Sequence, residues 1–170
     1  MGMERLYKDV MDLNRMEDGT EKENQAKAFF DKLNSTPLPE YFNWAEEIFE
    51  GLHVKERGDK DALIWTDIHT KEKKSFTYRE FADRGNQCLN YLQSQGIENG
   101  DNMYMMIPIV PETWFASLAC IKGGIIAVPT ATTMTIRELE FRFETYTPDS
   151  IMADEASADL IDQALETIGC

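Results

Sequence analysis

The sequence has few of the residues that bind metals or form disulfides. Its three cysteines, Cys88, Cys120 and Cys170, are odd in number and far apart, which excludes a disulfide framework and a zinc knuckle. The two histidines, His53 and His69, lack a metal-binding spacing, so we expect both to be structural or surface residues. Cys88 and Cys120 lie in apolar helical patterns and are expected in the core. No metal site is predicted.

Long apolar runs and excess positive charge are also missing. No stretch reaches the roughly 18 continuous apolar residues of a membrane-spanning helix, and charged residues interrupt the N-terminal MGMERL, unlike in a secretory signal. The 31 acidic residues outnumber the 17 basic ones, which gives a net charge of −14. Such a charge argues against nucleic acid and anionic membranes as partners. We therefore expect a cytoplasmic chain without membrane insertion.

Three motifs of nucleotide and acyl-transfer chemistry are absent. The sequence contains no G-x-x-x-x-G-K-[ST] phosphate loop, no G-x-G-x-x-G after a predicted strand and no G-x-S-x-G elbow. Gly123-Gly124 follows a predicted helix and precedes a predicted strand, whereas phosphate sites follow a strand and precede a helix. We therefore expect these glycines to end a helix. No two carboxylates have a spacing that pairs them for acid–base work.

What the sequence does contain is a clear pattern of helices in its first third. Residues 1–33 have apolar positions at helical spacing, in two pieces broken near Asp18-Gly19. The prolines of residues 34–39 predict a linker. Asn43 and Glu46 have the spacing of a capping box, which predicts the start of a short helix.

Beyond this helix the pattern changes to strands and then to alternating strands and helices. Ala62–Thr66 and Lys74–Tyr78 are separated by a short polar connection and predict an antiparallel hairpin. Capping boxes at Thr77–Glu80 and Thr135–Glu138, and a cap at Asp154, predict three helix starts. Further strands are predicted at Asn102–Ile107, Ile125–Val128 and Ser150–Ala153.

This order predicts an α/β fold with an open, mostly parallel sheet that helices flank, and with the antiparallel hairpin near its N-terminal side. We expect one mixed sheet, in which the hairpin strands pair antiparallel and the last three strands run parallel. From the residues alone the function stays open.

Several short motifs, taken in order, resemble those of medium-chain acyl-CoA synthetases. They are Phe42-Asn43-Trp44-Ala45, Ala62-Leu63-Ile64-Trp65, Ser75–Phe81, the run from Gly100-Asp101 through Pro108, Pro111-Glu112 and Trp114 to Gly123, Ala127-Val128-Pro129 with Thr132, and Glu138–Arg142. The chain is similar to the N-terminal part of an adenylate-forming (AMP-binding) acyl-CoA or acetyl-CoA synthetase. The resemblance covers about residues 42 to 168. We therefore expect an α/β subdomain at residues 42–170, preceded by the helical N-terminal extension and linker at residues 1–41.

The resemblance implies a two-step ligase. ATP and a carboxylic acid, such as a fatty acid, give an acyl-adenylate and pyrophosphate, and the acyl group then passes to the thiol of coenzyme A, with Mg²⁺ offsetting phosphate charge. The phosphate loop, the adenine-binding segment and the catalytic lysine of this family have no counterpart in the chain. We therefore expect an inactive fragment without catalytic residues, which binds none of these cofactors by itself and has the remainder of the same polypeptide as its partner.

One loop has a role implied by the resemblance. Some relatives place part of the coenzyme A site after the strand at Val128, which corresponds here to Thr130, Ala131, Thr132 and Thr133. The other interpretation is a tight strand-to-helix turn before the next helix. The arginines that acetyl-CoA synthetases carry after an Ala-Asp-Glu stretch are missing after Glu155, which favours the medium-chain branch.

Two other functions stay open at this point. The chain can be a non-catalytic α/β interaction or scaffold domain, or part of an adenylating enzyme with a different acyl acceptor. As a fragment, it is expected to expose an apolar face that a homodimer would bury.

Overall fold

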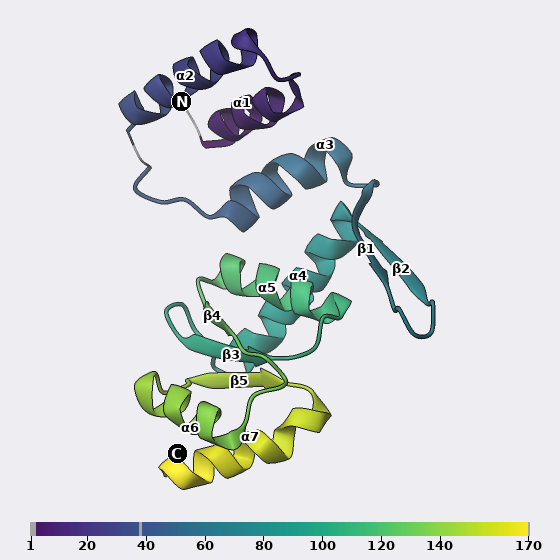
Figure 1. Ribbon diagram of the computed structural model, residues 1–170, viewed down its shortest axis with the longest axis vertical. Coiled ribbons are helices and arrows are strands. Elements are labelled where there is room, and N and C mark those ends of the chain that lie inside the picture. Colours follow the sequence, from purple (N-terminus) through teal and green to yellow (C-terminus); the bar gives the residue numbers. More distant parts are fainter. Residues whose placement is uncertain (1–2, 38, 170) are drawn as a thin grey trace. The chain divides into compact units, whose positions relative to one another are not determined.

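The chain divides between Glu56 and Arg57 into two units, Met1–Glu56 and Arg57–Cys170, each with its own internal contacts. The computed structural model describes residues 3–37 and 39–169, and Figure 1 draws the chain coloured along its sequence. Cys170 lies outside the described residues. The boundary expected after residue 41 refers to the organisation of a larger synthetase and stays a prediction.

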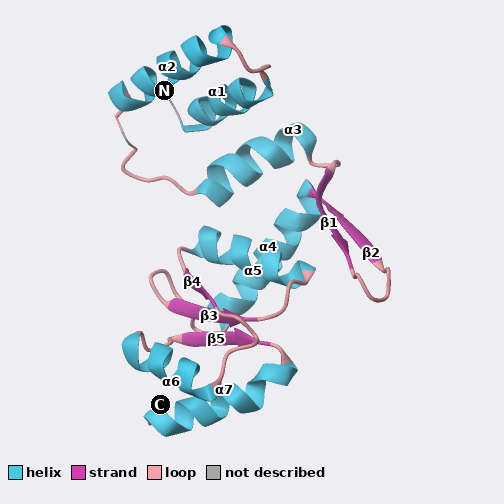
Figure 2. Ribbon diagram, viewed as in Figure 1, coloured by secondary structure: helices cyan, strands magenta, loops and turns pink. Residues whose placement is uncertain are grey.

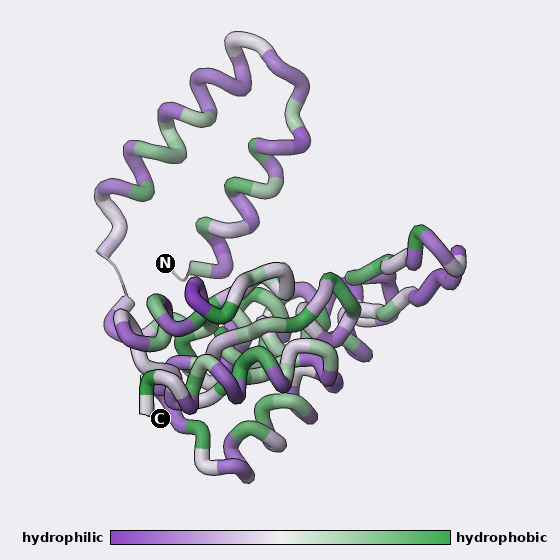
Figure 3. The backbone as a smooth tube through the Cα atoms, turned by 60° about the horizontal axis from the view of Figure 1, so that its bottom comes forward, coloured by the Kyte–Doolittle hydropathy of each residue, from purple (hydrophilic) through white to green (hydrophobic). Residues whose placement is uncertain are grey.

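The first unit is helical. Helices α1 (Met3–Arg15) and α2 (Thr20–Ser35) are separated at Gly19, as the sequence predicts. Hydrophobic positions alternate with hydrophilic ones along both helices (Figure 3). An ion pair between Asp9 and Lys32 joins them. The π-helix η1 (Ala45–Val54) continues into the short α3 (Lys55–Arg57).

Two side chains hold η1 in the first unit. The buried His53 lies 3.2 Å from the hydroxyl of Tyr7 in α1, so its predicted structural role is confirmed. The Asn43 side chain accepts hydrogen bonds from the backbone N–H groups of Ala45 and Glu46, at 3.0 and 3.3 Å. The Asn43 N–H in turn donates to the carboxylate of Glu47, at 3.4 Å, where a capping box would use Glu46, because the wider π-turn shifts the partner by one residue.

The second unit begins with the predicted hairpin. Strands β1 (Asp61–Thr66) and β2 (Lys73–Thr77) pair antiparallel, with Trp65 opposite Lys74. The ring of Phe76 meets the ring of Phe115 edge to face, with centroids 5.1 Å apart. A two-stranded hairpin is marginal alone, so this contact gives it a packing partner. His69 is exposed in its turn, as expected.

Four longer helices follow, and local chemistry defines their starts. Both predicted capping boxes are present, at α4 (Tyr78–Ser94) and α6 (Ile136–Thr145), and Asp154 caps α7 (Glu155–Ile168). Helix α5 (Pro111–Gly123) starts with a proline, whose missing N–H costs nothing there. Gly124 follows α5 with φ 66°, in the left-handed conformation that glycine adopts readily, so the predicted helix end is confirmed.

The remaining strands build a parallel sheet. Strands β3 (Asn102–Met106), β4 (Ile126–Pro129) and β5 (Ser150–Ala153) are ordered β4-β3-β5, and β3 pairs parallel with both neighbours. Every residue of the central strand β3 is buried.

The expectation of one mixed sheet is wrong, because β1 and β2 form a separate two-stranded sheet. Thr77 both ends β2 and caps α4. The hairpin packs on helix α5 through Phe76 and Phe115 and pairs with neither β4 nor β5.

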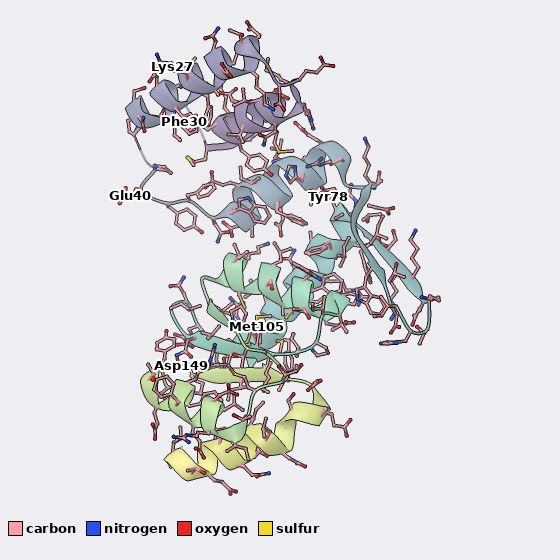
Figure 4. The ribbon with its side chains drawn as sticks, in the orientation of Figure 1. Lys27, Phe30, Glu40, Tyr78, Met105 and Asp149 are labelled. Atoms are coloured by element: carbon pink, nitrogen blue, oxygen red, sulfur yellow. The ribbon has the colours of Figure 1, made fainter. Side chains whose placement is uncertain are left out.

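The parallel sheet lies between two helical layers. Helices α4 and α5 cover one face, and α6 and α7 cover the other (Figures 1 and 2). Met103 and Met105 pack toward α4 and α5, whereas Tyr104 and Met106 pack toward α6 and α7. Met105 is labelled in Figure 4, in the middle of the second unit. This alternation follows from the two-residue period of a strand.

The two described cysteines belong to the layer of α4 and α5. Cys120 is 1% exposed, and Cys88 packs partly buried against the same cluster, so the predicted core role is confirmed. Burial raises the pKa of the Cys120 thiol to about 11. This thiol is therefore protonated at neutral pH and is not a nucleophile.

The amino end of the parallel sheet is fixed by a polar contact. The Asp149 carboxylate accepts hydrogen bonds from the backbone N–H and the side-chain amide of Asn102, at 2.8 and 2.6 Å. The same amide donates to the carbonyl of Thr147 at 2.9 Å. These bonds hold the start of β5 beside the start of β3 (Asp149 is labelled in Figure 4).

None of the described helices is both long enough and apolar enough to cross a bilayer. Large apolar side chains are exposed on both units, among them Phe30, Ile109 and Phe141. Dimerisation through such side chains stays a prediction.

The capping boxes predict a pH dependence of stability. The backbone N–H of Thr77 and then its hydroxyl lower the pKa of Glu80, and Thr135 does the same for Glu138. A carboxyl whose pKa is lower in the folded state stabilises the fold above its unfolded pKa. This contribution is lost as the pH falls through the lower, folded pKa.

The Thr77→Ala/Thr135→Ala double variant tests this contribution. When the pH is lowered from neutral to below the ordinary carboxyl pKa of 4.5, we expect the unfolding free energy of the double variant to fall less than that of the unchanged chain. Urea unfolding at both pH values measures this. Thr145→Ala, on the last turn of α6, removes a threonine hydroxyl that donates only to a backbone carbonyl and is the control. An unchanged pH slope in the double variant would contradict the assignment.

Candidate functional site

The second unit has a cleft at the carboxyl ends of β3 and β4. The chain leaves β3 toward α5 on one face of the sheet, and it leaves β4 toward α6 on the other face. The two loops therefore diverge from neighbouring strands. Open α/β sheets bind their ligands in such a crevice, at the switch point outside the carboxyl ends of the strands.

The cleft measures about 570 Å³ and has two walls. One wall is the β3–α5 loop with the first turns of α5, and the other is the β4–α6 loop. The structure thus brings the four residues of the predicted loop together with part of α5. The lining consists of Met105, Ile107, Pro108, Ile109, Thr113, Ser117, Pro129, Thr130, Ala131, Thr132 and Thr133.

Backbone hydrogen bonds shape the β4–α6 wall. The N–H of the buried Thr130 donates to the carbonyl of Met105 at 3.0 Å, which continues the pairing of β4 with β3 by one residue. Ala131, Thr132 and Thr133 are exposed. The N–H of Met134 donates back to the carbonyl of Ala131 at 3.2 Å. The loop is therefore a tight strand-to-helix turn that also lines the cleft, and this geometry is compatible with both interpretations of its role.

Three hydroxyl groups of the lining have already donated their protons. Thr113 donates to the carbonyl of Pro108 at 2.6 Å, Ser117 to that of Thr113 at 2.7 Å, and Thr130 to that of Val128 at 3.0 Å. A hydroxyl has one proton and two lone pairs, so toward a ligand these groups can only accept. The lining also includes no charged residue. The cleft therefore fits a neutral chain that carries N–H or O–H donors.

The same edge of the sheet does not fit a phosphate group. Three helices begin there, and their first turns carry Glu112, Glu138 and Glu155. The cap residues Thr135 and Asp154 already accept hydrogen bonds from the N–H groups of α6 and α7. An anion at the starts of α6 and α7 would meet negative charge and N–H groups that are already bonded. At the start of α5 it would meet Glu112 and Pro111, which has no N–H. No step of ATP chemistry is therefore assigned to these residues.

The donor groups of the described residues do not fit a metal ion either. Nowhere in 3–37 and 39–169 do three or more His, Cys, Asp or Glu side chains gather in a way that could hold one. No metal-dependent step is derived from this part of the chain.

Sequence reasoning missed one wall of the cleft. Thr113 and Ser117 are four residues apart and so lie on the same side of α5. Their spacing, following Pro108 and Pro111, was the available signal. It does not distinguish hydroxyls that line a cleft from hydroxyls that only bond their own helix.

Residues 52–169 match the model of a family described as AMP-binding enzyme. The chain is 41% identical over 127 residues to 4-hydroxybutyrate–CoA ligase 1 of Metallosphaera sedula, a match that covers 75% of the chain and 22% of that protein. It is 28% identical over 135 residues to the mitochondrial acyl-coenzyme A synthetase ACSM5 of Mus musculus, covering 76% of the chain and 23% of that protein.

The fold is also similar to that of coenzyme A ligases of known structure. A benzoate CoA ligase from Burkholderia xenovorans LB400 superposes with a TM-score of 0.63 at 22% identity, over 76% of the chain and 25% of that protein. The resemblance to acyl-CoA synthetases found in the sequence is confirmed. The chain spans about a quarter or less of the length of these relatives. Because ACSM5 is mitochondrial, the expected cytoplasmic location stays a prediction.

Proposed function

Since the chain belongs to the AMP-binding enzyme family, we propose that it is the N-terminal part of an AMP-forming ligase that joins a carboxylic acid to coenzyme A. In the first step the carboxylate oxygen attacks the α-phosphorus of ATP, and pyrophosphate leaves. In the second step the thiol of coenzyme A attacks the carbonyl carbon of the acyl-adenylate, and AMP leaves. The adenylation chemistry is assigned to residues outside this chain.

The cleft between the β3–α5 and β4–α6 loops is the observation that supports a role for this chain. We assign it to the pantetheine arm of coenzyme A, which is neutral and carries amide N–H groups. These donors match the lone pairs of Thr113, Ser117 and Thr130, whose protons are already donated. Ala131, Thr132 and Thr133 would form the outer wall of the arm's path.

The acid substrate is proposed from the relatives. The 4-hydroxybutyrate–CoA ligase of Metallosphaera sedula is named for a short aliphatic acid, and it shares 41% of its residues with the chain in the matched region. We propose an aliphatic acid, with 4-hydroxybutyrate as the first candidate and unsubstituted fatty acids as the second.

A pyrophosphate-release assay tests the function. A longer protein that contains this chain is given ATP, magnesium, coenzyme A and, in turn, acetate, butyrate, 4-hydroxybutyrate, octanoate and benzoate. We expect release with at least one aliphatic acid, and none from the 170-residue chain alone. Silence with every acid would contradict the proposed activity. Pyrophosphate release that never yields a coenzyme A thioester would contradict coenzyme A as the acyl acceptor. It would favour a different thiol or oxygen nucleophile.

A further inference from the structure

A tryptophan outside the cleft contacts one of its walls. The indole N–H of Trp65, in β1, donates a hydrogen bond to the carbonyl of Ile109, in the β3–α5 loop, at 2.9 Å. Ile109 lines the cleft, and Trp65 does not. The bond joins residues 44 positions apart in the chain. The hairpin therefore reaches the wall of the cleft through one side-chain donor.

Trp65 has a fixed position from which to donate. Lys74 lies opposite it on β2, with its ammonium nitrogen 5.6 Å from the centre of the indole ring. Two residues after Lys74 on β2, Phe76 packs edge to face on Phe115 of α5. The strand pair that carries Trp65 is thus attached to the same helix that the loop leads into.

The torsion angles of the loop explain why this bond matters. Pro108 has a fixed φ, and Ile107 and Val110 each precede a proline, which restricts them to extended conformations. Ile109 is the one residue between Ile107 and Pro111 without such a restriction. Its side chain is 77% exposed, so core packing does not hold it either. The bond from Trp65 fixes the carbonyl of this residue.

The peptide group that carries the Ile109 carbonyl is also held at its N–H, which belongs to Val110. The carbonyl of Pro108 accepts from the N–H of Val110 at 2.9 Å and from the hydroxyl of Thr113 at 2.6 Å. Helix α5 thus holds Pro108, and the hairpin holds Ile109. Loss of the Trp65 bond would leave the Ile109–Val110 peptide group held through its N–H but no longer through its carbonyl.

We propose that Trp65 is a positioning residue, which acts through the carbonyl of Ile109 to hold the β3–α5 wall of the cleft in the shape that the coenzyme A arm requires. The effect on the loop is independent of any ligand. The effect on coenzyme A rests on the proposed function.

Hydrogen exchange of the 170-residue chain tests the effect on the loop. Trp65→Phe keeps an aromatic ring on the hairpin and removes the N–H donor. We expect exchange in residues 107–113 to become about five-fold faster, the factor that corresponds to one net hydrogen bond, with no change in residues 81–92 of α4. Trp114→Phe is the matched control, because Trp114 is 47% exposed and its indole N–H makes no hydrogen bond within the described part of the chain.

Kinetics of the longer protein test the effect on coenzyme A. A change that only lowered stability would alter the amount of active enzyme, and so kcat. We expect Trp65→Phe to raise the KM for coenzyme A about five-fold while kcat stays unchanged. Faster loop exchange in an enzyme that makes no thioester would support the positioning role and contradict the proposed function.

Unchanged exchange of residues 107–113 in Trp65→Phe would overturn the inference. If the phenylalanine variant does not fold, benzothienylalanine at position 65 replaces it, because this residue keeps the bicyclic ring and lacks the N–H. If residues 107–113 exchange no faster in the analogue than in the unchanged chain, the inference is overturned in the same way.

Discussion

Replacing Phe143 by alanine should lower the free energy of unfolding by about 3–5 kcal/mol. The Phe143 side chain is 1% exposed, and its ring meets the ring of Tyr104 edge to face, with centroids 5.1 Å apart. The Tyr104 hydroxyl donates to the carbonyl of Tyr146 at 2.8 Å, so this ring is held from its other end. The variant would leave a cavity between α6 and the sheet.

Phe141, on the same helix, is the matched control. Its side chain is 70% exposed, so Phe141→Ala should change the free energy of unfolding by no more than about 0.5 kcal/mol. Urea unfolding of the two variants measures the difference. Equal losses at the two positions would mean that α6 does not present Phe143 to the sheet.

Replacing Ala131 by tryptophan in the longer protein should reduce thioester formation about ten-fold or more, while acyl-adenylate formation stays unchanged. Ala131 is exposed and lines the cleft. The fold therefore tolerates a larger side chain there, whereas a ligand in the cleft would lose space. The two half-reactions are separated by measuring carboxylate-dependent exchange of pyrophosphate into ATP and then thioester yield with coenzyme A.

Ala156→Trp is the control for this substitution. Ala156 is exposed on the first turn of α7 and does not line the cleft. Both half-reactions should be unaffected in it. An equal loss of both half-reactions in Ala131→Trp would contradict the assignment of the cleft to the coenzyme A arm.

The sequence predicts the helices and the parallel strands well where short-range chemistry defines them. The spacing of Thr77 with Glu80 and of Thr135 with Glu138 places two helix starts, and the structure has both capping boxes. The strand predicted at Ser150–Ala153 has the same bounds in the structure. These signals are local, because each depends on residues three or four positions apart.

Long-range contacts were not predictable from the same patterns. The alternation of a strand does not show which sheet it joins. The sequence therefore predicts one mixed sheet, whereas the hairpin forms a separate sheet. The bond from Trp65 to Ile109 and the bonds from Asn102 to Asp149 join residues more than forty positions apart. They involve single side chains and leave no periodicity in the sequence.

Of the two walls of the cleft, the sequence predicts the β4–α6 loop but not the wall formed by α5. Thr130 to Thr133 follow a strand end, and the resemblance to acyl-CoA synthetases indicated their loop. Thr113 and Ser117 belong to a helix whose pattern is that of a core helix, with Phe115, Leu118 and Ala119 buried. That they face a cleft depends on the divergence of two loops, which only the sheet order reveals.

The most direct test of the proposed two-step reaction follows an oxygen atom through the reaction of the longer protein. The acid is supplied with the heavy isotope of oxygen in its carboxylate, together with ATP, magnesium and coenzyme A. If the carboxylate attacks the α-phosphorus and the thiol then displaces AMP, one labelled oxygen remains on the phosphate of AMP. We expect heavier AMP in the same amount as the thioester, detected by mass spectrometry. Unlabelled AMP, or ADP as the nucleotide product, would contradict an acyl-adenylate and with it the proposed function.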